Sequence, residues 1–204
     1  MAKDMDSFLG LLSTTDTKQK LIIGFELLTY LQNGSSIECQ DIGHVVDSLL
    51  PWIQSSNFKY KFSIFSRKFD HDCNTSVEEG VNVSQMGLDV MTELSKRMES
   101  YFRPYIPSVL PSVIDRLGDS KELVRERCQL LLSELMEVGA ITPQQLFDRL
   151  LPAFSHKNSN VRDEIMKCLI ATLNHIFKND VHATQNPVKN LQRSCCSLFL
   201  VTDS

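Results

Sequence analysis

Residues 110–125 read LPSVIDRLGDSKELVR, and residues 151–162 read LPAFSHKNSNVR. Each stretch passes from an apolar segment with a Leu-Pro pair, through a polar turn, to a Val-Arg pair that opens a second apolar segment. This order is typical of two helices joined by a short turn, which forces the helices to pack antiparallel. Its recurrence along the chain indicates an internal repeat.

Two further stretches follow the same plan. Residues 50–59 read LPWIQSSNFK, with Phe-Lys in place of Val-Arg, and residues 15–20 read TDTKQK, just before another apolar segment. The basic residues that follow the four turns are Lys20, Lys59, Arg125 and Arg162. They are spaced by 39, 66 and 37 residues, and two of these intervals suit helical-pair repeats of the HEAT or armadillo kind. We therefore predict an all-α fold, an α-solenoid of HEAT repeats with about four helix pairs.

Apolar residues recur every three to four positions between the turns, as amphipathic helices require. The pattern predicts one helix face from Phe102 to Leu117 and another from Leu146 to Phe154. Asp119 or Ser120 is expected to cap a helix that opens at Lys121. Thr142 followed by Pro143 fits an N-cap with proline at the first helical position.

The long interval of 66 residues has an identifiable source. Residues 60–82 break the helical pattern, and removing these 23 residues restores an interval of 43 and joins Lys59 to the apolar segment that begins at Val83. We expect 60–82 to be a disordered insertion, either a regulatory segment or a gene-model artefact. The repeat domain is then 5–177, and 178–204 is an atypical, poorly ordered tail, because the helical period ends at Phe177. Either the tail covers the apolar face of the last repeat, or the domain is truncated.

Composition excludes several classes of function. The net charge of −4 argues against a nucleic-acid partner, and no apolar run of the chain is long enough to span a membrane. The sequence has no Gly-rich phosphate loop and no paired metal ligands; the triplet from His71 to Cys73 offers only two ligands. We therefore expect no enzyme, no cofactor and no metal. Cys128 and Cys168 stand among aliphatic residues, where a free thiol acts as a small buried hydrophobe.

Four stretches carry a resemblance to a known family: 51–59 with 87–90, then 109–126, then 154–164. They resemble the first TOG domain of CLASP proteins, the CLIP-associating microtubule stabilisers, over about residues 5–59 and 83–177. The resemblance implies a monomeric tubulin-binding module with six HEAT repeats in its full form. It also implies a location in the cytoplasm on the microtubule cytoskeleton, other microtubule-associated proteins as further partners, and work at the mitotic spindle and kinetochores in cell division.

TOG domains bind tubulin through the turns inside each repeat, so the resemblance places a binding edge at the four turns. Equivalent turns of a stacked solenoid lie on the same edge, which would gather the turn lysines into a basic ridge suited to an acidic partner. The expected partner-binding residues are Lys18, Lys20, Asn57, Lys59, Lys121, Lys157 and Asn158.

Other residues near the turns are expected to be structural. We expect Arg125 and Arg162 to hold neighbouring repeats together through ion pairs or helix-end carbonyls, and Trp52 to pack on the apolar side of its helix. Asp119 is better interpreted as a helix cap than as a catalytic acid. The alternative function is a non-enzymatic helical scaffold that binds another protein without contacting tubulin.

Overall fold

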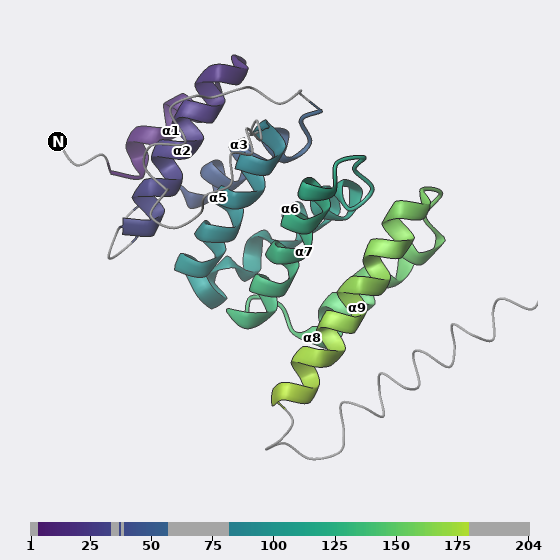
Figure 1. Cartoon of the computed structure of the whole chain (residues 1–204). Coiled ribbons are helices and arrows are strands. Elements are labelled where there is room, and N and C mark those ends of the chain that lie inside the picture. Colours follow the sequence, from purple (N-terminus) through teal and green to yellow (C-terminus); the bar gives the residue numbers. More distant parts are fainter. Residues whose placement is uncertain (1–3, 34–36, 38, 57–81, 180–204) are drawn as a thin grey trace, which may run out of the picture.

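The structure, a computed structural model, describes residues 4–33, 37, 39–56 and 82–179. These residues form α1 (Asp6–Leu12), α2 (Thr17–Asn33), α3 (Ile42–Ile53), α5 (Val83–Met98), the 3-10 helix η1 (Glu99–Tyr105), α6 (Ile106–Arg116), α7 (Glu122–Glu137), α8 (Pro143–Leu150), the 3-10 helix η2 (Leu151–Ser155) and α9 (Ser159–Asn179). No strand occurs among them. Figure 1 shows the helices stacked in chain order from α1 to α9.

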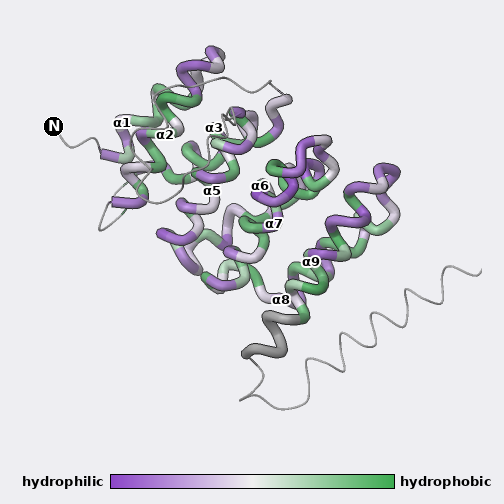
Figure 2. The backbone as a smooth tube through the Cα atoms, viewed as in Figure 1, coloured by the Kyte–Doolittle hydropathy of each residue, from purple (hydrophilic) through white to green (hydrophobic). Residues whose placement is uncertain are grey.

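The stack has two layers. The first helices of successive pairs, α1, α3 and α6, pack on one another, and so do the second helices, α2, α5 and α7, with α9 packed on α7. The largest fully buried side chains between the layers include Phe8, Trp52, Phe102 and Phe147. The turns between α6 and α7 and between η2 and α9 consist largely of hydrophilic residues (Figure 2). The described residues thus confirm the predicted all-α solenoid and its four helix pairs.

Two helices begin at capping boxes. Thr142 accepts a hydrogen bond from the backbone of Gln145, whose side chain accepts in return from the backbone of Thr142, which confirms the predicted start of α8. Asn82 and Gln85 make the same pair of bonds at the start of α5. Asn82, the last residue of the predicted insertion, is buried and caps α5.

Most of the predictions for the insertion and the tail concern residues that the structure does not describe. Residues 57–81, with the triplet at His71 and the junction at Lys59, lie outside the described residues, as do residues 180–204 of the predicted tail. Helix α9 continues to Asn179, two residues past the predicted end of the helical period.

Prolines divide two helices that the apolar pattern predicts to be continuous. The face expected from Phe102 to Leu117 begins in η1, and α6 starts only at Ile106. The face expected from Leu146 likewise passes from α8 into η2 at Leu151. Pro104 and Pro152 lie in the two 3-10 segments, and a proline lacks the N–H that an α-helix interior requires. The spacing of apolar residues alone does not predict where an α-helix and a 3-10 helix meet.

Trp52 occupies a space that two glycines leave open. A Cβ atom on Gly87 would lie 3.0 Å from the Cβ of Trp52 and 3.1 Å from the backbone N of Ile53. A Cβ atom on Gly24 would lie 3.1 Å from the indole ring. Helices α2, α3 and α5 therefore approach closely around one indole, which confirms the expected packing role of Trp52.

Candidate functional site

The first two repeats meet at Trp52, next to their turns. The indole N–H donates a 3.2 Å hydrogen bond to the carbonyl oxygen of Leu12, the last residue of α1. The Nζ atom of Lys20, in the first turn of α2, lies 5.9 Å from the centre of the same ring. An ammonium group within about 6 Å of an aromatic face is attracted to it. The turn after α1 is thereby fixed against the end of α3.

The second and third repeats meet at Arg116. Its Nη2 atom donates to the carbonyl oxygen of Ser55 at 2.6 Å, and its Nε atom donates to the Oγ of Ser84 at 3.3 Å. The same guanidinium lies 3.0 Å from a carboxylate oxygen of Asp119 in its own turn. Arg116 therefore ties the turn after α3, the start of α5 and the turn after α6 together.

The third and fourth repeats meet at Asn158. The Nδ2 atom of Asn158 donates to the carbonyl oxygen of Gly118 at 3.0 Å, and its Oδ1 atom accepts from the backbone of Asn160 at 3.0 Å. One side chain thus shapes its own turn and binds the preceding one. Contacts at all three junctions place the described parts of the four turns along one side of the solenoid, which we call the turn edge: residues 13–16, 54–56, 117–121 and 156–158. In Figure 1 the turns from α6 to α7 and from η2 to α9 lie on the upper side, and the connection from α7 to α8 lies on the lower side.

Two arginines repeat one arrangement at equivalent positions. The Nη1 atom of Arg125 donates to the carbonyl oxygens of Asp119 and Ser120, at 2.9 and 3.3 Å. The Nη1 atom of Arg162 donates to the carbonyl oxygens of His156 and Lys157, at 2.7 and 3.4 Å. Each arginine closes its own turn from the following helix. Both arginines bind turn carbonyls, as expected, and their equivalent positions confirm the 37-residue register between the third and fourth repeats. The expected contact between neighbouring repeats is confirmed for Arg125 by its ion pair with Glu164, whereas the bonds described for Arg162 lie within its own repeat.

A buried carboxylate joins these two repeats beneath the turn edge. Glu164 of α9 is 4% exposed, and its Oε1 atom lies 3.1 Å from the Nε of Arg125 and 2.9 Å from the Nζ of Lys167. Its other oxygen accepts from the amide of Gln129. A carboxylate this buried is stable only when such partners replace water. Helix α9 is therefore held to α7 by an ion pair as well as by apolar contacts.

Five of the predicted partner-binding residues lie in the described part of the chain, and all five are at or beside the turn edge. Lys18 and Lys157 are exposed, whereas Lys20, Lys121 and Asn158 are partly buried. Asn57 and Lys59 lie outside the described residues.

The predicted cap of α7 is wrong. Helix α7 begins at Glu122 with Lys121 as its N-cap, and that residue makes no side-chain capping bond. Asp119 instead accepts from the backbone N–H of Lys121 at 2.8 Å, within the turn. Asp119 fixes the turn rather than the helix end.

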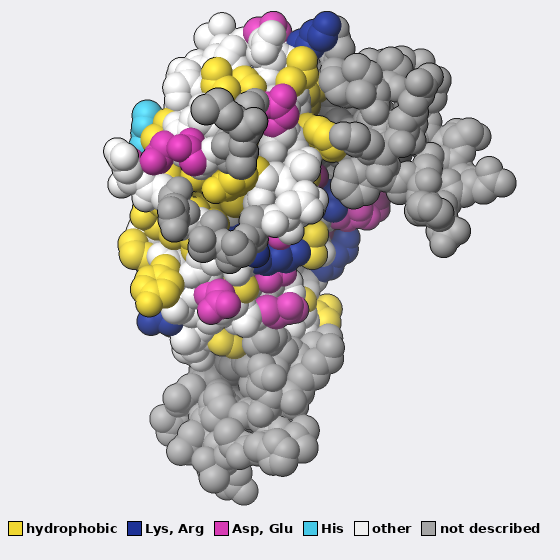
Figure 3. All heavy atoms as spheres, turned by 90° about the vertical axis from the view of Figure 1, so that its left-hand side faces the viewer, with side chains coloured by type: hydrophobic (Ala, Val, Ile, Leu, Met, Phe, Trp, Pro, Cys, Tyr) yellow, Lys and Arg dark blue, Asp and Glu magenta, His cyan; other side chains and the backbone are white. Residues whose placement is uncertain are grey.

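The turn edge carries both signs of charge. Exposed acids, Asp16 and Glu122, accompany the exposed Lys18 and Lys157. The carboxylate of Asp119 is paired with Arg116, so neither of these two groups is left as an isolated charge. Acidic and basic side chains are also interleaved on the side of α1 and α2 (Figure 3). The expected basic ridge is therefore a row of lysines among acidic neighbours.

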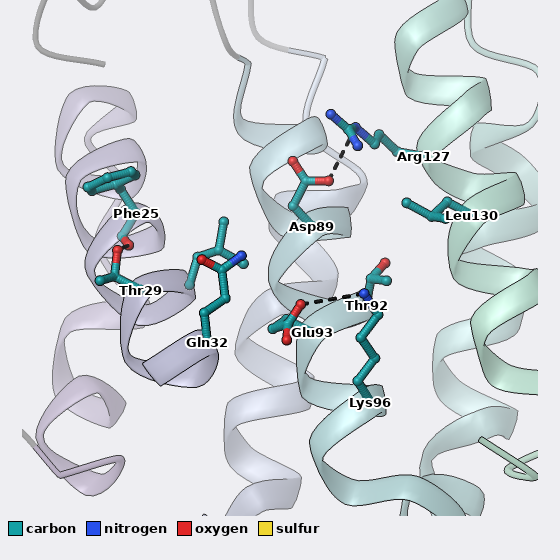
Figure 4. Close-up of a pocket in the computed structure, with 10 residues that line it drawn as sticks. Phe25, Thr29, Gln32, Asp89, Thr92, Glu93, Lys96, Arg127 and Leu130 are labelled. Atoms are coloured by element: carbon teal, nitrogen blue, oxygen red, sulfur yellow. Dashed lines mark hydrogen bonds and ion pairs between the residues drawn. The ribbon is translucent and has the colours of Figure 1, made fainter. Parts of the chain in front are cut away.

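A recess lies on the face formed by α2, α5 and α7. It encloses about 240 Å³, and its lining is Phe25, Leu28, Thr29, Gln32, Asp89, Thr92, Glu93, Lys96, Arg127 and Leu130. Figure 4 shows Arg127 of α7 reaching Asp89 of α5, where the Nε atom lies 3.2 Å from the carboxylate. Burial raises the pKa of Asp89, and the charge of Arg127 partly opposes this shift. The large apolar side chains come from the two outer helices of the recess, Phe25 and Leu28 from α2 and Leu130 from α7.

Sequence reasoning missed Arg116, Glu164 and this recess. Arg116 and Glu164 act across a repeat boundary, on residues that are more than 30 positions away in the chain. One sequence feature could have identified Glu164. It is a charged residue at a helix position that faces the core, on the same side of α9 as the buried Val161 and Ile165.

Neither metal binding nor a membrane-spanning helix finds support among the described residues. No three His, Cys, Asp or Glu side chains among them are grouped to hold a metal ion, and none of the described helices is long and apolar enough to cross a membrane. Burial raises the pKa of the Cys168 thiol to about 12 and also raises the pKa of the Cys128 thiol. Both thiols therefore stay protonated. Their burial confirms the expectation that these cysteines act as small buried hydrophobes.

Comparison with known proteins decides the family. The chain is 37% identical over 172 residues to a CLIP-associating protein of Drosophila melanogaster. The aligned region covers 83% of this chain and 10% of that protein. The crystal structure of the MAST/Orbit N-terminal domain superposes with a TM-score of 0.70 at 35% identity, covering 85% of this chain and 67% of that one. The chain belongs to the CLIP-associating protein family.

The CLIP-associating relatives are much longer than this chain, which spans about a tenth of the length of the curated relatives it matches. A TOG domain of crescerin, which uses a TOG domain array to regulate microtubules in the primary cilium, shares the fold with a TM-score of 0.56 at 20% identity, over 76% of this chain and 55% of that one. No protein-family model matches the chain.

Proposed function

We propose that this chain is a non-enzymatic TOG module that binds tubulin or microtubules through its turn edge. The observation that carries the proposal is the set of contacts from turn to turn, made by Trp52, Arg116 and Asn158. Because these bonds join successive helix pairs at or next to their turns, the edge is preorganised, and binding requires little ordering of the surface. Membership in the CLIP-associating family supports tubulin as the partner.

In this proposal the exposed Lys18 and Lys157 supply the charge that meets an acidic protein surface, at the first and last turns. Lys20 and Lys121 contribute from partly buried positions between them. Asn158 acts by holding the last two turns in register. Asn57 and Lys59 belong to the same proposal for the second turn.

The cellular proposal follows from the family. The module acts as a monomer in the cytoplasm, on the microtubule cytoskeleton, and supports microtubule stabilisation at the spindle and at kinetochores. Other microtubule-associated proteins are further proposed partners, whereas nucleic acid, membranes and cofactors are not.

Charge reversal at the turn edge tests the proposal. The double variant Lys18→Glu with Lys157→Glu should lower the affinity for microtubules by about tenfold at low ionic strength, measured by co-sedimentation. The attraction should also weaken as salt rises from about 0.05 to about 0.3 M, because exposed charges are screened.

The matched control reverses two exposed cations that lie outside both the turn edge and the recess, Arg103 and Arg149. It changes the net charge by the same amount and should leave most of the binding intact. Thermal melts of both variants establish that each is folded. Equal loss in both variants would show that only net charge matters and would remove the turn edge from the account.

The recess across α2, α5 and α7 favours a second candidate, a scaffold that binds another protein without tubulin. Its apolar residues, the exposed Leu130 of α7 and the partly buried Phe25 of α2, stand on opposite sides of a recess that also contains ion pairs (Figure 4). If Leu130→Asp abolishes microtubule co-sedimentation while the lysine reversals do not, binding occurs in the recess. If neither change affects binding, the scaffold function is favoured.

A further inference from the structure

Helix α9 has an apolar side that the described repeats do not cover. Val161, Ile165 and Cys168 are buried where α9 packs on the preceding helices. On the opposite side, Met166, Ile170 and Leu173 are 52%, 57% and 36% exposed. Their spacing of four and three residues aligns them along the helix. We call these three residues the α9 stripe; exposed apolar side chains in a row mark a contact surface.

The chain supplies a matching segment directly after α9. In the tail, Val188, Leu191, Cys195 and Leu198 follow spacings of three, four and three residues, which is typical of one apolar helix face. Asn186 followed by Pro187 is a helix start of the kind that Thr142 and Pro143 form at α8 in this structure. Residues 186–199, the tail segment, therefore have the start signal and the periodicity of an amphipathic helix.

We infer that the tail segment folds as a helix and packs antiparallel on the α9 stripe. The connection 180–185 is short, and short connections place consecutive helices antiparallel. In that orientation Leu191 faces Leu173, Cys195 faces Ile170 and Leu198 faces Met166, since both sets span seven residues, or about 10 Å of helix.

The tail is a better occupant than a second copy of the chain. Three side chains on one helix offer far less surface than the roughly 1,200 Å² that a stable interface between separate chains buries. A tethered segment binds its own chain at an effective concentration in the millimolar range, so a small contact suffices.

Disulfide trapping tests the pairing in the full chain. In a Cys196→Ser background, Ile170→Cys introduces a thiol that should face Cys195, and mild oxidation should link the two within one chain in most molecules. The control is Ala171→Cys, which is exposed on a different side of α9. It should form at least about tenfold less of the link to Cys195, quantified by peptide mass mapping. Equal linkage in both variants would overturn the pairing, and a disulfide between two chains through the new thiol would assign the stripe to a second copy.

Substitutions in the tail provide a second readout. Leu191→Asp with Leu198→Asp should lower the melting temperature and should speed amide hydrogen exchange in α9 by about tenfold or more, because the stripe loses its cover. Asn190→Asp with Ser197→Asp adds the same charge on the opposite side of the proposed helix and should change neither. If the two pairs behave alike, the tail segment does not cover α9.

Discussion

The first and the third repeat junctions lie on the same turn edge but are held by different chemistry. At the first, Trp52 is buried between α2 and α5 where Gly24 and Gly87 make room for it. At the third, Asn158 binds the carbonyl of Gly118, and Glu164 is bonded to Arg125. Packing that is mainly apolar, with Lys20 over the indole as its one described charge, should depend little on pH and salt, whereas buried polar groups depend on every partner being present. The repeats along the turn edge are thus held together by two kinds of interaction, which respond differently to pH and salt.

The largest effect should come from emptying the first junction. Trp52→Ala should lower the free energy of unfolding by about 3–5 kcal/mol, because a large cavity opens and the carbonyl of Leu12 loses its donor. Urea unfolding followed by far-ultraviolet circular dichroism measures this loss. Tyr101→Ala, at a side chain that is 81% exposed, is the control and should stay within about 0.5 kcal/mol. A loss below about 1 kcal/mol for Trp52→Ala would contradict the packing described for this junction.

The third junction should weaken at alkaline pH. Cys128 and Cys168 lie between α7 and α9, and burial raises the pKa of both thiols, that of Cys168 to about 12. An unfolded thiol ionises near pH 8.5, so above that pH the unfolded state loses protons that the folded state keeps, and stability falls. Between about pH 8 and about pH 9.5 the two thiols together should cost about 2.5 kcal/mol.

The double variant Cys128→Ala with Cys168→Ala isolates this contribution. Its stability should fall less over the same pH range, by the amount that the two thiols contribute. Identical pH profiles for the two proteins would show that the thiols are not buried in the folded state.

A smaller effect at the first junction tests the close approach of its helices. Gly87→Ala should cost about 1–3 kcal/mol, because the new methyl group meets the backbone of α3, which cannot move aside as a flexible side chain can. Gly10→Ala is the control: nothing lies within 4 Å of a Cβ at that exposed helical position, so stability should be unchanged or up to about 1 kcal/mol higher. Similar effects of both changes would show that α3 and α5 are not in close contact.

The smallest change separates the last two turns. Asn158→Ala should cost about 1 kcal/mol through the lost bond to Gly118, and it should weaken microtubule binding because the last turn loses its register. Asn160→Ala removes an exposed amide at the start of α9, two residues further on, and serves as the control. If Asn158→Ala destabilises the protein but leaves binding unchanged, the last turn does not take part in docking.

Much of this architecture follows from the sequence because its signals are local. The recurring Leu-Pro, polar turn and Val-Arg order predicts the helix pairs, and Arg125 and Arg162 occupy equivalent places. Thr142 with Pro143 marks the start of α8 for the same reason. These features need only a few neighbouring residues.

What the sequence does not predict depends on distance in space. Arg116 acts on Ser55, and Glu164 acts on Arg125, so neither role has a local signature. Asp119 was expected to cap α7 because capping residue types also favour turns, and here the turn formed instead. The capping pair of Asn82 with Gln85 at the start of α5 was likewise not predicted, although an asparagine three residues before a glutamine is a local capping signal.

Hydrogen–deuterium exchange of the chain with and without tubulin would locate the docking surface directly. We expect slower exchange on binding at 13–20, 54–56, 117–121 and 156–160, with no change in the connections at 99–105 and 138–142 on other parts of the solenoid. Protection confined to α2, α5 and α7 around the recess, or to the connections between repeats, would contradict docking through the turn edge.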